Sequence, residues 1–282
     1  MALEQGFTLS VEELAMGVAL LGFPEDASRI LQVEFGQLQP EVARAYLDAA
    51  SHSLIARGWI TWEEGTARLL PALAERLTAF VETQFSLLLQ KRPRQGPTTV
   101  LTFHVHPRGI LAHLLTRDVV HHLAPLSPKD ILAAALSFLE VPPSQWENEE
   151  RQVGMLSADA FRSLFRSSSQ AMLHQALSAT TLPDDVQHAL EEDFLHARHR
   201  ALLLLIEYDQ ERQPFSQEGA FLLQGPERAW FFIPVPEQDE PAFEVYPFAL
   251  SRFRAVMQTL LEKGRAKTRS GKSGKGEATE GP

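Results

Sequence analysis

The feature that most constrains the fold of this chain is an order of predicted elements that occurs twice. In the second occurrence, a helical pattern at Asp184–Arg200 precedes Ala201–Tyr208, which opens with six consecutive apolar residues. Such a run is too short to span a membrane and is typical of a strand buried on both faces. Three shorter strand-like runs follow, at Ala220–Leu223, Ala229–Ile233 and Phe243–Tyr246. Pro247 ends the last run, and the pattern predicts a helix from there to Leu261.

The first occurrence lies between residues 98 and 139. Three strands and a helix are expected in the same order, at Thr98–His106, Ile110–Leu115, Val119–Ala124 and Pro128–Leu139. Pro125 ends the third strand, and placing it on Pro247 aligns the two closing helices without a gap. We therefore predict an α+β fold with two quasi-symmetric halves, each an antiparallel sheet flanked by helices. The halves are expected at residues 1–140 and 141–262, and a disordered basic tail at residues 263–282.

Composition and charge narrow the possible chemistry. The 282 residues include no cysteine, which excludes disulfides, thiolate metal sites and a cysteine nucleophile. Residues 263–282 carry six Lys or Arg and two Glu, a net +4, so the body carries about −14 of the overall −10. Residues 1–6 have neither the basic nor the apolar part of a signal peptide. We expect a cytoplasmic protein with no membrane span.

The N-terminal part has the pattern of a winged-helix module, three predicted helices followed by a hairpin at residues 59–70. A capping box at Ser10–Glu13 begins the first helix. This pattern raises the alternative of a DNA-binding regulator. However, Glu41 and Asp48 on the third helix and Glu63-Glu64 at the hairpin tip would face the phosphates. Nucleic acid is therefore not expected as a partner.

Histidines in the first set of strands are the strongest chemical candidates; they are His104, His106, His113, His121 and His122. His104 and His106 lie two residues apart on one strand and could chelate zinc with His113 or His121 as a third ligand. A metal-dependent enzyme is therefore a second alternative. However, Leu101, Phe103 and Val105 alternate with the polar residues, which favours histidines on the solvent-facing side of a one-sided strand. There they would form a protonation-sensitive surface patch.

No other pattern completes a catalytic or cofactor site. Gly271–Gly276 lacks the spacing of a phosphate-binding loop, and no strand precedes it. Ser167–Ser169 lacks the glycines of a nucleophile elbow. His196 and His199 lack the His-Glu-x-x-His arrangement of zinc proteases. We therefore expect no enzymatic activity, no cofactor and no bound metal.

Aromatic residues at strand spacing are the remaining candidate site. Trp230 and Phe232 share one face of their predicted strand, and Phe221 and Leu223 share a face of the preceding strand. If helices cover only the other side of the sheet, these side chains form an apolar surface for a protein partner. The alternative is that both sides of the sheet belong to the core. We predict the partner-binding site at these four residues.

Four short segments resemble motifs of the EspG-type chaperones of type VII (ESX) secretion. Leu9–Leu14 resembles the opening helix of that family, and Leu54–Ile60 the segment before its hairpin. Leu222–Trp230 is similar to a hairpin of the form D-T-P-x-G-R-W, and Glu244–Ser251 to the entry into the last helix. Gln224 stands where the family usually has Asp.

The resemblance covers residues 8–262 and implies a function. Members of that family have two quasi-symmetric α+β halves and bind the helical tip of a PE–PPE heterodimer, which they keep soluble and address to one secretion system. By this resemblance, the chain is expected to be a cytoplasmic chaperone for a helical-hairpin substrate, PE–PPE-like or WXG100-like, that keeps the substrate soluble and export-competent.

Overall fold

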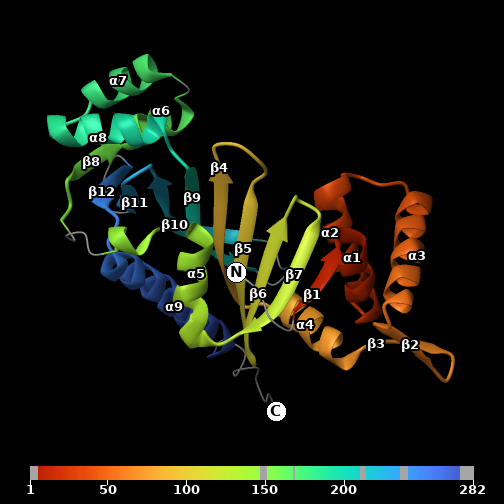
Figure 1. Ribbon diagram of the computed structural model, residues 1–282. Helices are drawn as coiled ribbons and strands as arrows, with labels where there is room; N and C mark the ends of the chain where they lie inside the picture. The colour runs from red at the N-terminus through yellow and green to blue at the C-terminus, as the bar shows by residue number, and fades with distance from the viewer. Residues whose placement is uncertain (1–5, 147–150, 168, 210–213, 236–240, 274–282) are drawn as a thin grey trace, which may run out of the picture. The chain divides into compact units, whose positions relative to one another are not determined.

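The computed structural model describes residues 6–146, 151–167, 169–209, 214–235 and 241–273 (Figure 1). Contacts within the chain divide it into two compact units. Unit 1 comprises Met1–Ser86 and Pro97–Ile131, and unit 2 comprises Leu87–Gly96 and Leu132–Pro282. Helices and antiparallel strands in both units confirm the predicted α+β class. The division into halves at residue 140 stays a prediction.

Unit 1 contains a sheet with the strand order β1-β7-β6-β5 and a separate two-stranded hairpin. Its elements are β1 (Phe7–Ser10), α1 (Val11–Leu20), α2 (Pro24–Phe35), α3 (Pro40–Ala56), β2 (Ile60–Glu63), β3 (Thr66–Leu69), α4 (Pro71–Val81), β5 (Thr99–His106), β6 (Gly109–Thr116), β7 (Val120–Leu126) and the 3₁₀ turn Pro128–Asp130. The predicted capping box is present, with Ser10 accepting from the Glu13 amide and the Glu13 carboxylate accepting from the Ser10 amide.

Strand β7 continues through Pro125 to Leu126, so the prediction that Pro125 ends this strand is wrong. Pro125 pairs with Leu111 of β6, while β1 pairs with β7 only as far as Leu123. Among the described residues Pro125 therefore has a strand neighbour on only one side, and there its missing N–H is tolerated.

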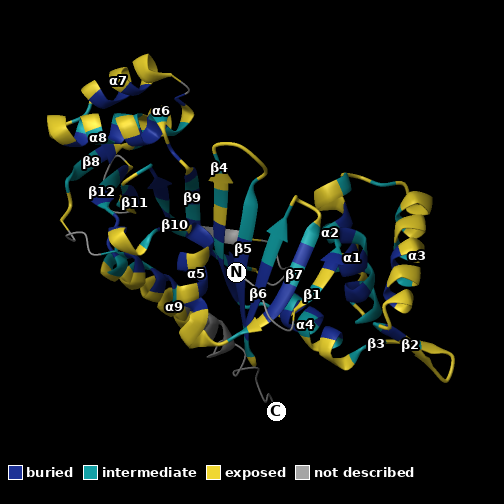
Figure 2. Cartoon of the chain, viewed as in Figure 1, coloured by how far each residue is buried: buried dark blue, intermediate teal, exposed yellow. Residues whose placement is uncertain are grey.

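Helices α1 and α4 cover one face of the unit 1 sheet. Leu14 and Val18 of α1 and Leu73 and Leu77 of α4 are fully buried against each other and the strands (Figure 2). The two helices approach closely at Gly17, where a Cβ atom would lie 2.5 Å from Leu77 Cδ1.

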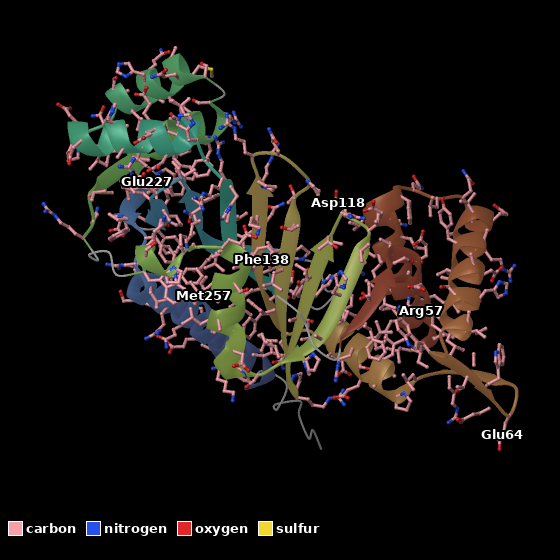
Figure 3. The ribbon with its side chains drawn as sticks, viewed as in Figure 1. Arg57, Glu64, Asp118, Phe138, Glu227 and Met257 are labelled. Carbon is pink, nitrogen blue, oxygen red and sulfur yellow. The ribbon has the colours of Figure 1, made fainter. Side chains whose placement is uncertain are left out.

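Helix α3 buries only Ala50 and Leu54. Figure 3 shows Glu64 at the tip of the β2–β3 hairpin.

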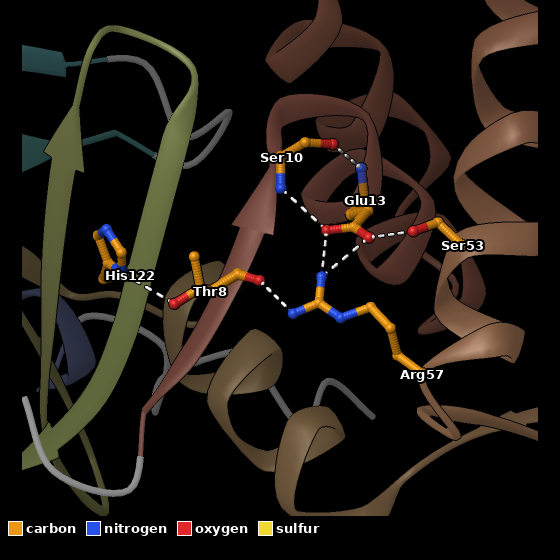
Figure 4. A network of polar contacts seen from close by, with 6 residues as sticks. All are labelled: Thr8, Ser10, Glu13, Ser53, Arg57 and His122. Atoms are coloured by element: carbon orange, nitrogen blue, oxygen red, sulfur yellow. Dashed lines mark hydrogen bonds and ion pairs between the residues drawn. The ribbon is translucent and has the colours of Figure 1, made fainter.

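A network centred on Glu13 ties α3 to the start of α1 (Figure 4). The buried Glu13 carboxylate accepts from Arg57 Nη1 at 3.0 and 2.8 Å and from Ser53 Oγ at 2.7 Å. Arg57 Nη2 also donates to the Thr8 carbonyl at 2.8 Å, and its guanidinium stacks 3.5 Å from the centroid of the Trp59 ring. These donors outweigh burial, so the pKa of Glu13 is lowered.

Unit 2 contains strands in the order β4-β9-β10-β11-β12-β8. Its elements are β4 (Phe85–Pro93, of which Phe85 and Ser86 belong to unit 1), α5 (Ile131–Leu139, of which Ile131 belongs to unit 1), the 3₁₀ turn Pro143–Gln145, β8 (Gly154–Ser157), α6 (Ala158–Arg166), α7 (Gln170–Ser178), α8 (Asp184–Leu195), β9 (His199–Tyr208), β10 (Pro214–Gln224), β11 (Ala229–Val235), β12 (Ala242–Pro247) and α9 (Leu250–Ser273).

Two predicted boundaries in unit 2 are wrong. Helix α8 ends at Leu195 and not at Arg200, because His199 and Arg200 already pair with Gln224 and Leu223 of β10. Helix α9 continues to Ser273, so residues 263–273 of the predicted disordered tail are helical. Extending an established helix adds one hydrogen bond per residue fixed. Residues 274–282 of the tail lie outside the described residues.

The repeated order of elements extends further than the sequence indicated. In each half a short strand leads directly into a helix capped by serine, β1 into α1 at Ser10 and β8 into α6 at Ser157. Each short strand then pairs antiparallel with the last strand of its meander, β1 with β7 and β8 with β12.

No helix within the described ranges combines the length and apolar character needed to cross a membrane.

Candidate functional site

The four residues predicted to bind a partner lie in the core of unit 2. Trp230, Phe232 and Leu223 are buried and Phe221 is partly buried, on the sheet face that α6, α7 and α8 cover. The ring of Phe161 in α6 lies 4.8 Å from that of Phe221 and 5.6 Å from that of Phe232, centroid to centroid. The exposure that the prediction required is therefore absent, because three helices that the strand pattern does not reveal occupy this face.

The turn between β10 and β11 anchors helix α8 to the sheet. The fully buried Asp193 of α8 accepts through Oδ2 from Trp230 Nε1 at 2.7 Å and from Arg228 Nε at 2.8 Å. Gly225 lies so close that a Cβ atom there would be 2.1 Å from Asp193 Oδ1. The Gly225–Trp230 part of the family-like motif Leu222–Trp230 therefore has a structural role: it fixes the helices over the aromatic core.

A partly buried apolar strip lies beside these helices on the same sheet face. Side chains alternate along β9, with Ala201, Leu203 and Leu205 buried and the intervening Leu202, Leu204 and Ile206 only half-buried. Leu202 pairs with Phe221, which places the half-buried set on the α6–α8 side of the sheet. Helix α8 packs on β10, and α6 on β8 and β12. We call Leu88, Leu202, Leu204 and Ile206 the open strip.

Leu88 of β4 joins this strip by the same alternation. Leu87 and Leu89 are buried, and Lys91 on their side pairs with Glu140 at 2.8 Å and lies 5.1 Å from the Phe138 ring centroid, near α5. Leu88 is half-buried on the opposite side of β4. The strip is therefore aliphatic, lies on two strands, and is bordered by the helices α6–α8.

Arginines lie at one end of the strip. Burial lowers the pKa of Arg200 in β9, and the charge of the nearby Arg92 in β4 lowers it further. Arg200 donates to the Phe165 carbonyl, and its guanidinium lies 5.6 and 5.3 Å from the ring centroids of Phe165 and Phe194. Among the described residues neither Arg92 nor Arg200 forms an ion pair with a carboxylate. On an acidic protein this end of the strip is locally positive.

The histidines predicted to line a solvent-facing strand are mostly inside unit 1. His104, His113 and His121 are buried on the face that α4 covers, and only His106 and His122 are partly exposed. The predicted polar surface is wrong for these three rings, because Phe80 of α4 packs edge-on against His104 and His113. His104 and His106 do not form a metal pair, since the ring nitrogens of His104 contact Ser86 and His113. In the part of the chain that the structure describes, no three His, Asp or Glu side chains are arranged to hold a metal ion.

The fold has a counterpart among solved structures. It is similar to the structure of the Mycobacterium tuberculosis type VII secretion system chaperone EspG5 in complex with the PE25–PPE41 dimer, with a TM-score of 0.62. The match covers 92% of this chain and 96% of EspG5 at 11% sequence identity. The resemblance to EspG-type chaperones is therefore confirmed at the level of the fold.

The family is shown by sequence. Residues 6–257 match the family model described as uncharacterised protein YfjC, and the chain belongs to this family. It is 23% identical over 245 residues to the uncharacterised protein YfjC of Bacillus subtilis (strain 168). This alignment covers 86% of this chain and 94% of that protein.

Proposed function

We propose that this chain is a cytoplasmic, non-enzymatic chaperone that binds a helical-hairpin substrate of type VII secretion and keeps it soluble for export. The observation that carries the proposal is the fold shared with EspG5 over nearly the whole of both chains. EspG5 was solved with the PE25–PPE41 dimer bound. The substrate of the present chain would be PE–PPE-like or WXG100-like.

The open strip is the surface that we propose for this contact. A secretion substrate with an apolar helical tip needs a complementary apolar surface to shield it from water. Leu88, Leu202, Leu204 and Ile206 offer branched or long aliphatic side chains on rigid strands, so that little conformational entropy is lost on binding. The helices α6–α8 border one side of the strip, and this arrangement suits a helix packed lengthwise on the sheet.

The test is binding by a variant in the centre of the strip. Helical-hairpin proteins encoded near this chain would be co-expressed with it, and the affinity of the purified pair measured by calorimetry. Leu204→Glu should weaken binding by about 2 kcal/mol or more, roughly thirtyfold, because it buries a charge at the contact. Its melting temperature should change less than for a substitution in the core, since Leu204 is only half-buried.

The matched control is Val33→Glu, at an apolar residue of α2 that is 84% exposed and belongs to unit 1. It should bind like the unchanged protein. Equal affinities for Leu204→Glu and the unchanged protein would place the contact elsewhere. If no helical-hairpin protein binds either of them, the chaperone proposal itself fails.

A further inference from the structure

Three histidines and a serine form a continuous hydrogen-bonded chain inside unit 1. Ser86 Oγ lies 3.0 Å from His104 Nδ1, His104 Nε2 lies 3.3 Å from His113 Nδ1, and His113 Nε2 lies 2.8 Å from His121 Nδ1. The neighbouring rings are nearly parallel, with interplanar angles of 19°. All four residues are buried. We call this the histidine chain.

The register of the sheet produces this chain. His113 on β6 pairs with Thr102 of β5 on one side and with Leu123 of β7 on the other. His104, two residues after Thr102, and His121, two residues before Leu123, are therefore its diagonal neighbours. The three rings therefore step across neighbouring strands on one face, under α4. Diagonal neighbours on a sheet are within reach of ring-sized side chains.

One end of the histidine chain has no partner. His121 Nε2 is buried and has no hydrogen bond among the described residues. Every other ring nitrogen of the three histidines lies in a link of the chain. Burying an imidazole nitrogen without a hydrogen-bond partner costs free energy, so this end of the histidine chain needs an explanation. The side chain of Glu12 in α1 acts on His121, favouring its protonated form.

The number of hydrogens that the chain can hold follows from the chemistry of imidazole. A neutral ring carries one N–H, so each His–His link holds one hydrogen and all rings must share the same tautomer. An added proton at His121 Nε2 is accommodated when every ring points its Nδ1–H along the chain and His104 donates to Ser86. A second added proton would set two N–H groups against each other and break a link.

We infer that Ser86, His104, His113 and His121 form one proton-binding site, which takes up a single proton at His121 Nε2 and loses a hydrogen bond when a second arrives. The pKa values agree with this order. Burial lowers the pKa of His104 to about 3, whereas the pKa of His121, lowered by burial and His122 and raised by Glu12, is about 4. The geometry gives the same order, since only His121 Nε2 at the end of the chain has no hydrogen-bond partner among the described residues.

The charged and titratable groups facing this site are few. Glu12 comes from α1, and His106 and His122 come from β5 and β7. The charged residues of α4, which are Glu75 and Arg76, and the adjacent Glu82 act on His106. Glu13 is held by Arg57. Because Phe80 of α4 packs directly against the rings of His104 and His113, the second proton should loosen this helix from the sheet.

The experiment is a pH titration of the whole protein by nuclear magnetic resonance of the histidine ring nitrogens. At pH 8 the three buried rings should show one common tautomer. As the pH falls, His121 should gain the first proton, and once it has done so His113 and His104 should both be in the Nδ1–H form. Three independent titrations, or mixed tautomers at pH 8, would overturn the proposal.

Two variants separate a specific effect from a general change in charge. Glu12→Gln should move the first protonation of the histidine chain to lower pH and leave His106 unchanged. The control Glu75→Gln removes a carboxylate that raises the pKa of His106. It should therefore lower the pKa of His106 and leave the titration of the histidine chain unchanged. If Glu12→Gln leaves the titration of His121 where it was, the assigned counter-charge is wrong and the proposal falls.

Discussion

At the scale of single residues, Trp230 shows the difference between an apolar pattern and an apolar surface. Its ring is buried and its Nε1 donates to Asp193. Trp230→Ala should therefore lower the free energy of unfolding by about 3–5 kcal/mol, the cost of truncating a buried aromatic residue. Chemical denaturation followed by circular dichroism measures this loss.

Trp230→Phe serves as the graded comparison, since it removes the hydrogen bond to Asp193 but only part of the aromatic ring system. Its cost should be about 1–3 kcal/mol, because a buried carboxylate loses a donor. Should Trp230→Ala be as stable as the unchanged protein, the side chain is not part of the core and our description of this face is wrong.

At the scale of elements, the contact between Arg57 and Glu13 decides how firmly α3 is held to α1. Glu13 is buried and Arg57 supplies two of its hydrogen bonds. Arg57→Ala should destabilise the protein by about 1–3 kcal/mol, because the carboxylate keeps only part of its donors. The control is Arg68→Ala, whose pair with Glu63 is largely exposed and should contribute about 0–1 kcal/mol. Equal urea midpoints for the two variants would contradict this.

At the scale of the whole molecule, stability should fall in mild acid. Burial lowers the pKa of His104 to about 3 and that of His121 and His199 to about 4, from an ordinary value of 6.5. Below pH 6.5 the unfolded chain therefore binds more protons than the folded one. Each such histidine should raise the unfolding constant by about tenfold per pH unit down to its folded pKa.

Urea midpoints at pH 8, 6 and 5, at constant ionic strength, measure this effect. Little change is expected between pH 8 and 7, and a steep decline below pH 6. The lowered pKa values of Glu13 and Glu140 act in the same direction, but only below their ordinary value of 4.5. A midpoint that stays constant from pH 8 to pH 5 would show that these rings are not buried as described.

Local signals predicted the elements well, and packing decided what they could not. The capping box at Ser10–Glu13 is encoded by neighbouring residues and was identified from them. Alternation assigned Trp230 and His104 to particular strand faces but could not show that α6–α8 and α4 cover those faces. The Arg57–Glu13 contact joins residues 44 positions apart. No pattern within one element reports such partners.

The same reasoning explains why the open strip was missed. Leu202 and Leu204 lie in a run of continuous apolar residues, which predicts a strand buried equally on both faces. The structure buries one face fully and the other by half. That difference depends on how far the helices α6–α8 reach across the sheet, which is a property of tertiary packing.

Strand β4 has a consequence for the order of events during synthesis of the chain. Its residues from Leu87 belong to unit 2, yet the rest of that unit begins at Leu132. Its neighbour β9 begins only at His199. On the ribosome, one hydrogen-bonding edge of β4 therefore stays unpaired while the whole stretch from Pro93 to His199 is made. Such an edge invites pairing with other nascent chains, so slow translation of this stretch should favour aggregation of the protein.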